Sequence, residues 1–460
     1  MSVVSPDLLR KFDLNGPRYT SYPTADRFVE AFSESAYLQA LEQRRIGALA
    51  NNLPLSLYVH LPFCESLCYF CTCHKIITKR HDKADTYLRY LSREIDLHTA
   101  HLGVTTSVSQ LHLGGGTPTF LSDEQLGALM ATLRRSFNFV PGGDYAIEVD
   151  PRTVDANRLA VLAGLGFNRL SFGVQDFDLE VQKAVHRIQP AEQVFALVDA
   201  ARKLGFESIN VDLIYGLPQQ TPESFERTLA QITALRPDRV ALYAYAHLPE
   251  RFKPQHRIAT AQLPNSGTKV AMLSRSLEAL DAAGYVYVGM DHFALPGDSL
   301  AVAKRQGRLH RNFQGYSAQA DGDLIALGVS AIGRVGATYS QNAKTLDEYY
   351  DHLDQGRLPV VRGLALSRDD LVRRAVIMAL MCQGELQFES VENAFLIDFK
   401  SYFATEFDAL VGLANQGLVT VSDVGLQVTA KGWFFVRAVA MVFDRYLQID
   451  RNRSRFSKII

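Results

Sequence analysis

Short runs rich in β-branched and aromatic residues alternate with amphipathic stretches from about residue 53 onward. The strand candidates are LSLYVHL (55–61), SQLHL (109–113), YAIEV (145–149), NRLSF (168–172), INVDLI (209–214), VALYAY (240–245) and YVYVGM (285–290). Six or more successive strand–helix units predict parallel strands that are joined by right-handed crossovers. We therefore expect an α/β fold containing a partial TIM-type (β/α)6 barrel, although periodicity alone does not decide whether a barrel closes.

The segment TPESFERTLAQITAL illustrates the helical stretches that separate the strand candidates. Thr221 can cap the helix, and Pro222 suits the first helical position because its missing N–H would have no partner there. The apolar residues that would share one face are Phe225, Leu229, Ile232 and Leu235. This spacing predicts a helix that packs against a sheet.

The two ends of the chain differ from this pattern. Residues 1–52 include GPRYTSYPT, which is too rich in Pro, Gly and Thr for a regular element, so we predict an irregular extension that could cover a site as a lid. Residues 53–365 would form the barrel. Residues 366–460 are mainly helical, with a β-hairpin in LVTVSDVGLQVT that turns at Asp423–Gly425 and a helix from Lys431.

Helices combined with a hairpin resemble a winged-helix module, which raises the question of DNA binding. Residues 366–460 contain 11 basic and 11 acidic side chains, so this part of the chain has no basic footprint. We therefore expect a structural cap.

The composition is that of an ordinary soluble protein. The 460 residues are 47% hydrophobic and 21% charged, and the net charge of −1 gives no bias toward nucleic acid or anionic membrane. The N-terminus lacks the apolar core of a signal peptide, and no apolar run approaches the roughly 20 residues that a membrane span requires. We expect a cytoplasmic protein.

Four of the five cysteines lie in the stretch FCESLCYFCTCHK. Their spacing is C-x3-C-x2-C-x-C, from Cys64 through Cys68 and Cys71 to Cys73, and His74 follows directly. In an unsecreted chain that is otherwise poor in cysteine, such a group indicates metal binding and argues against disulfides.

Two kinds of metal site fit this loop. A zinc site would take four ligands, with Cys73 or His74 as the fourth, but such sites usually draw ligand pairs from two separated knuckles. An iron–sulfur cubane held by three thiolates leaves one iron open to substrate or cofactor, and the spacing differs from that of ferredoxins, in which thiolates saturate the cluster. We favour the cluster.

Polar or conformationally special residues follow each of the first six predicted strands. They are His60 and Pro62; Gly114, Gly115, Gly116, Thr117 and Pro118; Glu148 and Asp150; Gln175 and Asp176; Asp212 and Tyr215; and Tyr245 and His247. Because parallel barrels carry their working residues at the carboxyl ends of the strands, these positions predict one pocket.

The cysteine loop after the first strand resembles that of the radical S-adenosylmethionine (SAM) superfamily. The motifs PRYTSYPT, YVHLPFC, CYFCTC, LHLGGGTPT, IEVDPR, FGVQDF, VDLIYGLP, YAHLP and HRNFQGY together resemble the oxygen-independent coproporphyrinogen III oxidase (dehydrogenase) family. This resemblance runs from about Gly16 to the C-terminus. Thr72 and His74 stand where a small residue and an asparagine are expected, which changes the polarity beside the cluster but not the ligand set.

The resemblance implies a [4Fe-4S] cluster held by Cys64, Cys68 and Cys71, with SAM on the open iron. It also implies two SAM molecules. Residues similar to those around the first SAM are Tyr58, Gly115, Glu148 and Ile332. Residues similar to those around the second are Phe70, Gly116, Thr117, Gln175, Arg187, Asp212 and Ala246. Cys73, Tyr58 and Glu148 would be catalytic, whereas Ile332 and Ala246 would otherwise be taken for packing residues.

The chemistry implied by the resemblance belongs to haem biosynthesis. The reduced cluster would cleave SAM to methionine and a 5′-deoxyadenosyl radical, which abstracts hydrogen from the propionate β-carbon on rings A and B of coproporphyrinogen III. Loss of CO2 and one electron leaves a vinyl group, and two rounds give protoporphyrinogen IX. A rival is a haem chaperone of the same superfamily, but such relatives usually lack the fourth cysteine and the long leader.

The four carboxylates of the substrate require cationic or polar partners. The candidates are Arg18, Lys304, Arg308, Arg311 and Gln314, most of them in AVAKRQGRLHRNFQGY, which could equally be a solvated basic loop. The remaining partners would be an unidentified electron donor and acceptor. We expect a monomer that binds neither nucleic acid nor membrane.

Overall fold

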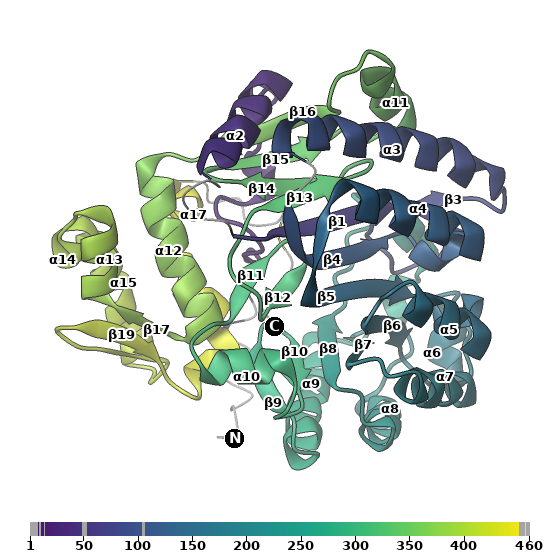
Figure 1. Ribbon diagram of the computed structural model, residues 1–460. Coiled ribbons are helices and arrows are strands. Elements are labelled where there is room, and N and C mark those ends of the chain that lie inside the picture. The colour runs from purple at the N-terminus through teal and green to yellow at the C-terminus, as the bar shows by residue number, and fades with distance from the viewer. Residues whose placement is uncertain are drawn as a thin grey trace.

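A sheet of 12 strands forms the centre of the molecule (Figure 1). The computed structural model describes residues 8, 11–12, 14–47, 53–103, 106–449 and 456. The strand order is β16-β15-β14-β13-β1-β4-β5-β6-β7-β8-β10-β9. Six of these strands run parallel in chain order: β1 (Leu55–Leu61), β4 (Ser107–Gly115), β5 (Asn138–Val149), β6 (Arg169–Gln175), β7 (Ser208–Tyr215) and β8 (Arg239–Ala244).

Helices connect these strands and cover the outer face of the curved sheet (Figure 1). They are α3 (Asp82–Leu102), α4 (Asp123–Ser136), α5 (Ala156–Gly164), α6 (Leu179–Ala184), α7 (Ala191–Lys203), α8 (Pro222–Leu235) and α9 (Ser266–Ala282). The prediction for α8 is confirmed: Thr221 accepts a hydrogen bond from the Ser224 N–H, and the four apolar residues of the predicted face are buried.

The barrel is open. Its first strand, β1, pairs on its other edge with β13 (Leu324–Leu327), and its last strand, β8, pairs with the antiparallel β10 (His292–Ala294). This confirms the partial (β/α)6 barrel. The run YVYVGM contributes β9 (Val286–Gly289), which pairs antiparallel with β10 and ends the sheet, so it is not a seventh parallel strand.

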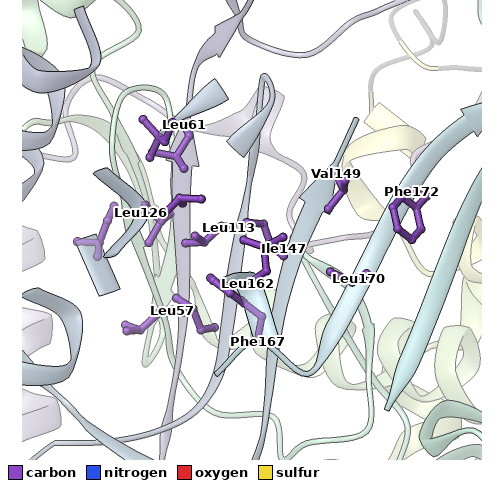
Figure 2. Packing of buried hydrophobic residues seen from close by; sticks show 14 of the residues in the cluster. Leu57, Leu61, Leu113, Leu126, Ile147, Val149, Leu162, Phe167, Leu170 and Phe172 are labelled. Carbon is purple, nitrogen blue, oxygen red and sulfur yellow. The ribbon is translucent and has the colours of Figure 1, made fainter. Parts of the chain in front are cut away.

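Apolar residues on the outward side of the strands form the main core. Leu57, Leu113, Ile147 and Leu170 come from four adjacent strands and are almost completely buried; the side chain of Leu162 from α5 lies among them (Figure 2). Burial of this side is the main force that holds the helices on the sheet. The opposite side of these strands is polar.

At the edge beyond β13 an antiparallel meander extends the sheet, and a short hairpin forms a separate sheet of two strands. These elements are α10 (Ser299–Arg305), β11 (His310–Asn312), β12 (Gly315–Ser317), β14 (Ile332–Val335), β15 (Thr338–Asn342), α11 (Leu346–Asp354) and β16 (Val360–Ala365). The meander places Ile332 beside the first strands of the barrel.

The C-terminal part has its own hydrophobic core. Its elements are α12 (Arg368–Gln383), β17 (Glu385–Gln387), α13 (Phe388–Phe395), α14 (Phe399–Tyr402), α15 (Ala404–Ala414), β18 (Val419–Val421), β19 (Gly425–Val428), α16 (Val436–Val442) and α17 (Arg445–Ile449). The predicted hairpin is β18–β19, and β17 adds a third strand.

The N-terminal extension combines irregular and regular structure. Residues 16–24 contain no helix or strand, as expected, yet Tyr19 and Tyr22 are buried in the core of the C-terminal part. The helix α2 (Glu34–Gly47) was not predicted, because only three of its residues are buried and its apolar pattern is weak. Among the residues described above, no helix is long and apolar enough to cross a membrane.

Candidate active site

Two adjoining cavities open at the inner side of the barrel. The inner cavity has a volume of 410 Å³ and lies within the barrel, whereas the rim cavity has a volume of 370 Å³ and lies at the carboxyl ends of the strands. Glu148, Ser171 and Asp212 line both cavities, so they form the wall between them.

Most of the predicted site residues line one of these cavities. The rim cavity collects Cys64, Cys68, Phe70, Cys71, Cys73, Gly115, Gly116, Thr117, Glu148, Gln175, Arg187 and Asp212. The inner cavity collects Tyr58, Glu148, Asp212, Gln314 and Ile332. Of the residues predicted to form one pocket at the strand ends, those that line the rim cavity are Gly115, Gly116, Thr117, Pro118, Glu148, Asp150, Gln175 and Asp212, whereas His60 lines the inner cavity. The residues that line neither cavity are Pro62, Gly114, Asp176, Tyr215, Tyr245 and His247, so the prediction of a single pocket is wrong for them.

A small parallel ladder holds the cysteine loop. The strands β2 (Phe63–Cys64) and β3 (Ile76–Ile77) pair with each other, so both ends of the loop are fixed beside the end of β1. Lys75 bridges two parts of the loop, since its Nζ donates to the carbonyl of Cys71 over 3.0 Å. The cysteines consequently face the rim cavity and form no disulfide.

The thiols sit in different environments. Burial, the largest cause, raises the pKa of the Cys64 thiol to about 11, and the neighbouring Cys71 and Cys68 contribute to this rise. A hydrogen bond from the Cys73 thiol lowers the pKa of Cys71 to about 6. Cys73 thus lies next to one predicted ligand.

This donor set fits an iron–sulfur cluster. Within the part of the chain that the structure describes, no three His, Cys, Asp or Glu side chains converge closely enough to hold a single metal ion. In a cubane each thiolate binds a different iron, so three thiols spread along one cavity wall suit a cluster better than one zinc ion.

The glycines after β4 bring backbone close to the cysteine loop. Gly115 has a φ of 119°, and a Cβ there would lie 2.8 Å from His60 Cε1. A Cβ at Gly116 would lie 2.6 Å from the carbonyl oxygen of Pro62. Both positions therefore require glycine. Thr117 Oγ1 lies 3.3 Å from the sulfur of Cys64.

Glu148 is held at the wall between the cavities. Its Oε2 accepts a hydrogen bond from the Gly115 N–H over 3.3 Å, and its Oε1 lies 3.1 Å from His112 Nε2. Asp212 faces the same wall, and burial, followed by the charge of Glu148, raises the pKa of Asp212 to about 7. Two carboxyl groups near one another in a cavity suit the recognition of an ammonium group or of ribose hydroxyls.

Tyr58 and His60 form a second polar pair beside Glu148. Tyr58 OH lies 3.0 Å from His60 Nδ1, and His60 Nε2 donates to the carbonyl of His74 over 3.0 Å. Burial lowers the pKa of His60 to about 4, so this imidazole is neutral near pH 7. The cysteine loop is thereby tied to the inner strand β1.

The remaining predicted residues lie at the end of β6, in the loop after α6 and in the loop after β8. Gln175 has a φ of 70°, which places this residue at a sharp bend after β6. Arg187 Nη2 donates to the carbonyl of Gly173 over 2.6 Å. Ala246 does not line either cavity, but Gln255 Nε2 donates to the carbonyls of both Ala246 and Phe70, which joins this loop to the cysteine loop.

The predicted substrate-binding cations divide into two groups. Arg18 pairs with Asp291 and lies over the ring of Tyr243, a residue of the inner cavity. Arg311 is buried over the ring of Tyr316, another residue of that cavity, and its Nη1 has no hydrogen-bond partner among the described residues.

The other two cations lie elsewhere. Lys304 lines neither cavity; its Nζ donates to the carbonyls of Tyr287 and Val288 and lies 4.0 Å from the ring centroid of Trp433. Burial lowers the pKa of Lys304 to about 7. Arg308 is exposed and bonds to Gln306.

The inner cavity contains polar residues that the strand-end argument did not select. They are Gln110 and His112 on β4, Asp144 on β5, Arg169 and Ser171 on β6, Ser208 and Asn210 on β7, and Arg239 and Tyr243 on β8. Each strand presents them at alternate positions, so period-2 polarity within the strands is the signal that could have found them.

An open β/α barrel with a three-thiol loop after its first strand defines a radical SAM enzyme. Residues 58–232 match the family model described as the Radical SAM superfamily, and residues 366–435 match that of the HemN C-terminal domain. Membership of this superfamily implies a [4Fe-4S] cluster and SAM.

The similar proteins narrow the class further. An oxygen-independent coproporphyrinogen III oxidase from Pseudomonas aeruginosa is 52% identical over 457 residues, which cover 99% of this chain and 98% of that relative. One from Escherichia coli is 49% identical over 453 residues, which cover 98% of each chain. A solved structure of coproporphyrinogen III oxidase (HemN) from Escherichia coli, a radical SAM enzyme, has a TM-score of 0.90 and 48% identity, and the match covers 95% of this chain and 100% of that one. The chain belongs to the oxygen-independent coproporphyrinogen III oxidase family.

Proposed function

We propose that the protein converts coproporphyrinogen III to protoporphyrinogen IX without oxygen, as a monomer served by a separate electron donor and acceptor. The observation that carries this proposal is the shared wall of Glu148, Ser171 and Asp212 between a thiol-lined cavity and a polar cavity inside the barrel. A reactive group made on one side of this wall can reach a substrate on the other.

Cys64, Cys68 and Cys71 would hold the [4Fe-4S] cluster in the rim cavity. When bound, the cluster and SAM supply a 5′-deoxyadenosyl radical. Glu148 and the Gly115 backbone would orient one SAM molecule. A second would contact Gly116, Thr117, Gln175, Arg187 and Asp212, which lie on the same cavity wall.

The inner cavity would take the substrate side chain that reacts. Tyr58, Gln314 and Ile332 line it close to Glu148 and provide both polar and apolar contacts. On each of rings A and B, the propionate would lose one hydrogen atom, CO2 and one electron to become a vinyl group.

The remaining propionates require positive charge near the mouth of the inner cavity. Arg18 and Arg311 lie over Tyr243 and Tyr316, two residues that line this cavity. Burial lowers the pKa of Arg437, and the charges of Arg18 and Arg311 lower it as well. These three guanidinium groups are accompanied by the carboxylate of Asp291. The resulting excess of positive charge supports a site for the carboxylates of the substrate.

The leader would act as a lid. Arg437 Nε donates to the carbonyl of Pro17, and Tyr19 OH donates to Asp444, so residues 16–22 are anchored to the C-terminal part. Arg18 reaches from this anchored segment to Asp291 at the turn before β10. We expect substrate to replace Asp291 as a partner of Arg18.

The deciding experiment is anaerobic turnover. Reconstituted, reduced protein is incubated with SAM and coproporphyrinogen III, and 5′-deoxyadenosine and the vinyl product are measured. Formation of both supports the proposal. Haem binding without a vinyl product would favour the chaperone, although the relatives above carry the name of the oxidase.

A further inference from the structure

Two arginines donate to the sulfur of one predicted cluster ligand. Arg187 Nη1 lies 3.4 Å and Arg152 Nη2 lies 3.6 Å from Cys68 Sγ. Asp150 joins the two, since its Oδ2 lies 2.7 Å from Arg152 Nη2 and 3.3 Å from Arg187 Nη1. Next to Cys68 there are thus two guanidinium groups and one carboxylate, with a net charge of +1.

Arg152 is held more firmly than an ordinary surface arginine. It lies in the 3-10 helix η3 (Pro151–Thr153) directly after β5, and its backbone N–H and its Nε both donate to Asp150 Oδ1, over 3.1 and 3.0 Å. The Asp150 side chain is 8% exposed and that of Arg152 is 21% exposed. Because Nε and Nη2 both donate to the Asp150 carboxylate, the plane of the guanidinium group is fixed. In this orientation Nη2 also donates to Cys68 Sγ.

A hydrogen-bond donor at a cluster sulfur changes the reduction potential in a predictable direction. Reduction adds one negative charge to an iron–sulfur cluster, and hydrogen bonds to its sulfurs together with nearby positive charge stabilise the reduced form. Because Arg152 and Cys68 are largely shielded from water, this stabilisation is screened less than at an exposed site.

We propose that Arg152 is a positioning residue that, through its hydrogen bond to Cys68 and clamped by Asp150, raises the reduction potential of the cluster. The inference rests on the proposed function, because it requires Cys68 to be a cluster ligand. Arg187 and Arg152 both line the rim cavity, but only Arg187 is among the residues assigned to the second SAM molecule. Arg152 is therefore the residue to change.

The test is a redox titration of the reconstituted full-length protein in the absence of coproporphyrinogen III. The reduced cluster is followed by electron paramagnetic resonance, and iron and sulfide are counted in each sample. Arg152→Gln should shift the midpoint potential to a more negative value while iron and sulfide stay at the wild-type level. Arg152→Lys keeps the charge but loses the planar fork, so its shift should be smaller and in the same direction.

Arg158→Gln is the matched control. Arg158 lies nearby on α5, but its guanidinium pairs with Asp123 and the Leu121 carbonyl. Its replacement should leave the potential unchanged.

Three outcomes decide the inference. A wild-type potential in Arg152→Gln with a full cluster overturns it. If Arg152→Gln loses its cluster, the lysine variant decides: a more negative potential supports the inference, and an unchanged one overturns it. A full cluster in Cys68→Ser would instead contradict the ligand assignment, so failure of the proposed function is recognised separately.

Discussion

Replacement of Glu148 by glutamine tests the wall between the two cavities. Glu148 receives the Gly115 N–H on one oxygen and lies beside His112 Nε2 with the other. Glutamine has a single oxygen, so it satisfies one of these donors and places an NH2 group against the other. It also loses the charge that would bind the SAM ammonium group.

The expected loss of affinity follows from the type of contact. A hydrogen bond to a charged group contributes about 1.5–3 kcal/mol, which corresponds to a roughly 10- to 150-fold weaker first SAM site.

Affinity for the proposed second SAM molecule should depend on pH. The pKa of Asp212 is about 7 because burial and the charge of Glu148 both disfavour its carboxylate. In the wild type, affinity that depends on the Asp212 carboxylate is gained as the pH rises through about 7. Removing the charge of Glu148 lowers the pKa of Asp212, so in Glu148→Gln this gain should occur at lower pH.

Anaerobic calorimetric titration of reconstituted protein with SAM at pH 6, 7 and 8 measures both effects. Glu226→Gln is the control, since Glu226 is exposed on α8, where it pairs with Arg275. The reasoning is refuted if the first site keeps its wild-type affinity, or if the pH midpoint of the second site does not move.

Three further predictions follow from the cysteine loop and the leader. Single serine replacements of Cys64, Cys68 or Cys71 should abolish the cluster absorbance, because only three thiolates bind it; a full iron content in any of them would contradict the ligand set. Cys73→Ser should keep iron and sulfide but lower turnover markedly, whereas loss of the cluster would make Cys73 a ligand. Deletion of residues 1–30 should spare the cluster and SAM cleavage but impair decarboxylation. Because this deletion also removes the buried Tyr19 and Tyr22, Arg18→Gln is the cleaner test, and wild-type decarboxylation in that variant would argue against a lid.

The strand order could be predicted because each parallel strand carries a strong local signal. INVDLI alternates apolar residues with Asn210 and Asp212, VALYAY is largely apolar, and Thr221 and Pro222 mark the start of α8 in the sequence itself. The cysteine spacing is equally local, since all three predicted cluster ligands come from one loop. Local signals of this kind do not depend on distant contacts, so they predicted the parallel strands and the position of the cysteine loop.

Long-range contacts carry no such signal. The burial of Tyr19 and Tyr22 depends on partners more than 400 residues away, such as Asp444. The helix α2 has a weak apolar pattern of its own. It packs against α3 and the meander strands, and this tertiary packing stabilises it. Neither feature could be read from a window of neighbouring residues.

The polar interior of the barrel is the most informative difference, because it follows from a pattern that was present in the sequence. On β7, Ser208, Asn210 and Asp212 alternate with buried apolar residues, and all three line the inner cavity. In a packed parallel barrel the inner positions are filled by branched apolar side chains. Here Asn210 donates instead to Ser171 and Asp212, and ion pairs such as Arg239–Asp298 satisfy the charges deeper inside. Polar groups that are desolvated in this way are stable only when they are paired with one another or with a ligand. The alternation therefore distinguishes a barrel that encloses a polar substrate from one that is filled by its own core.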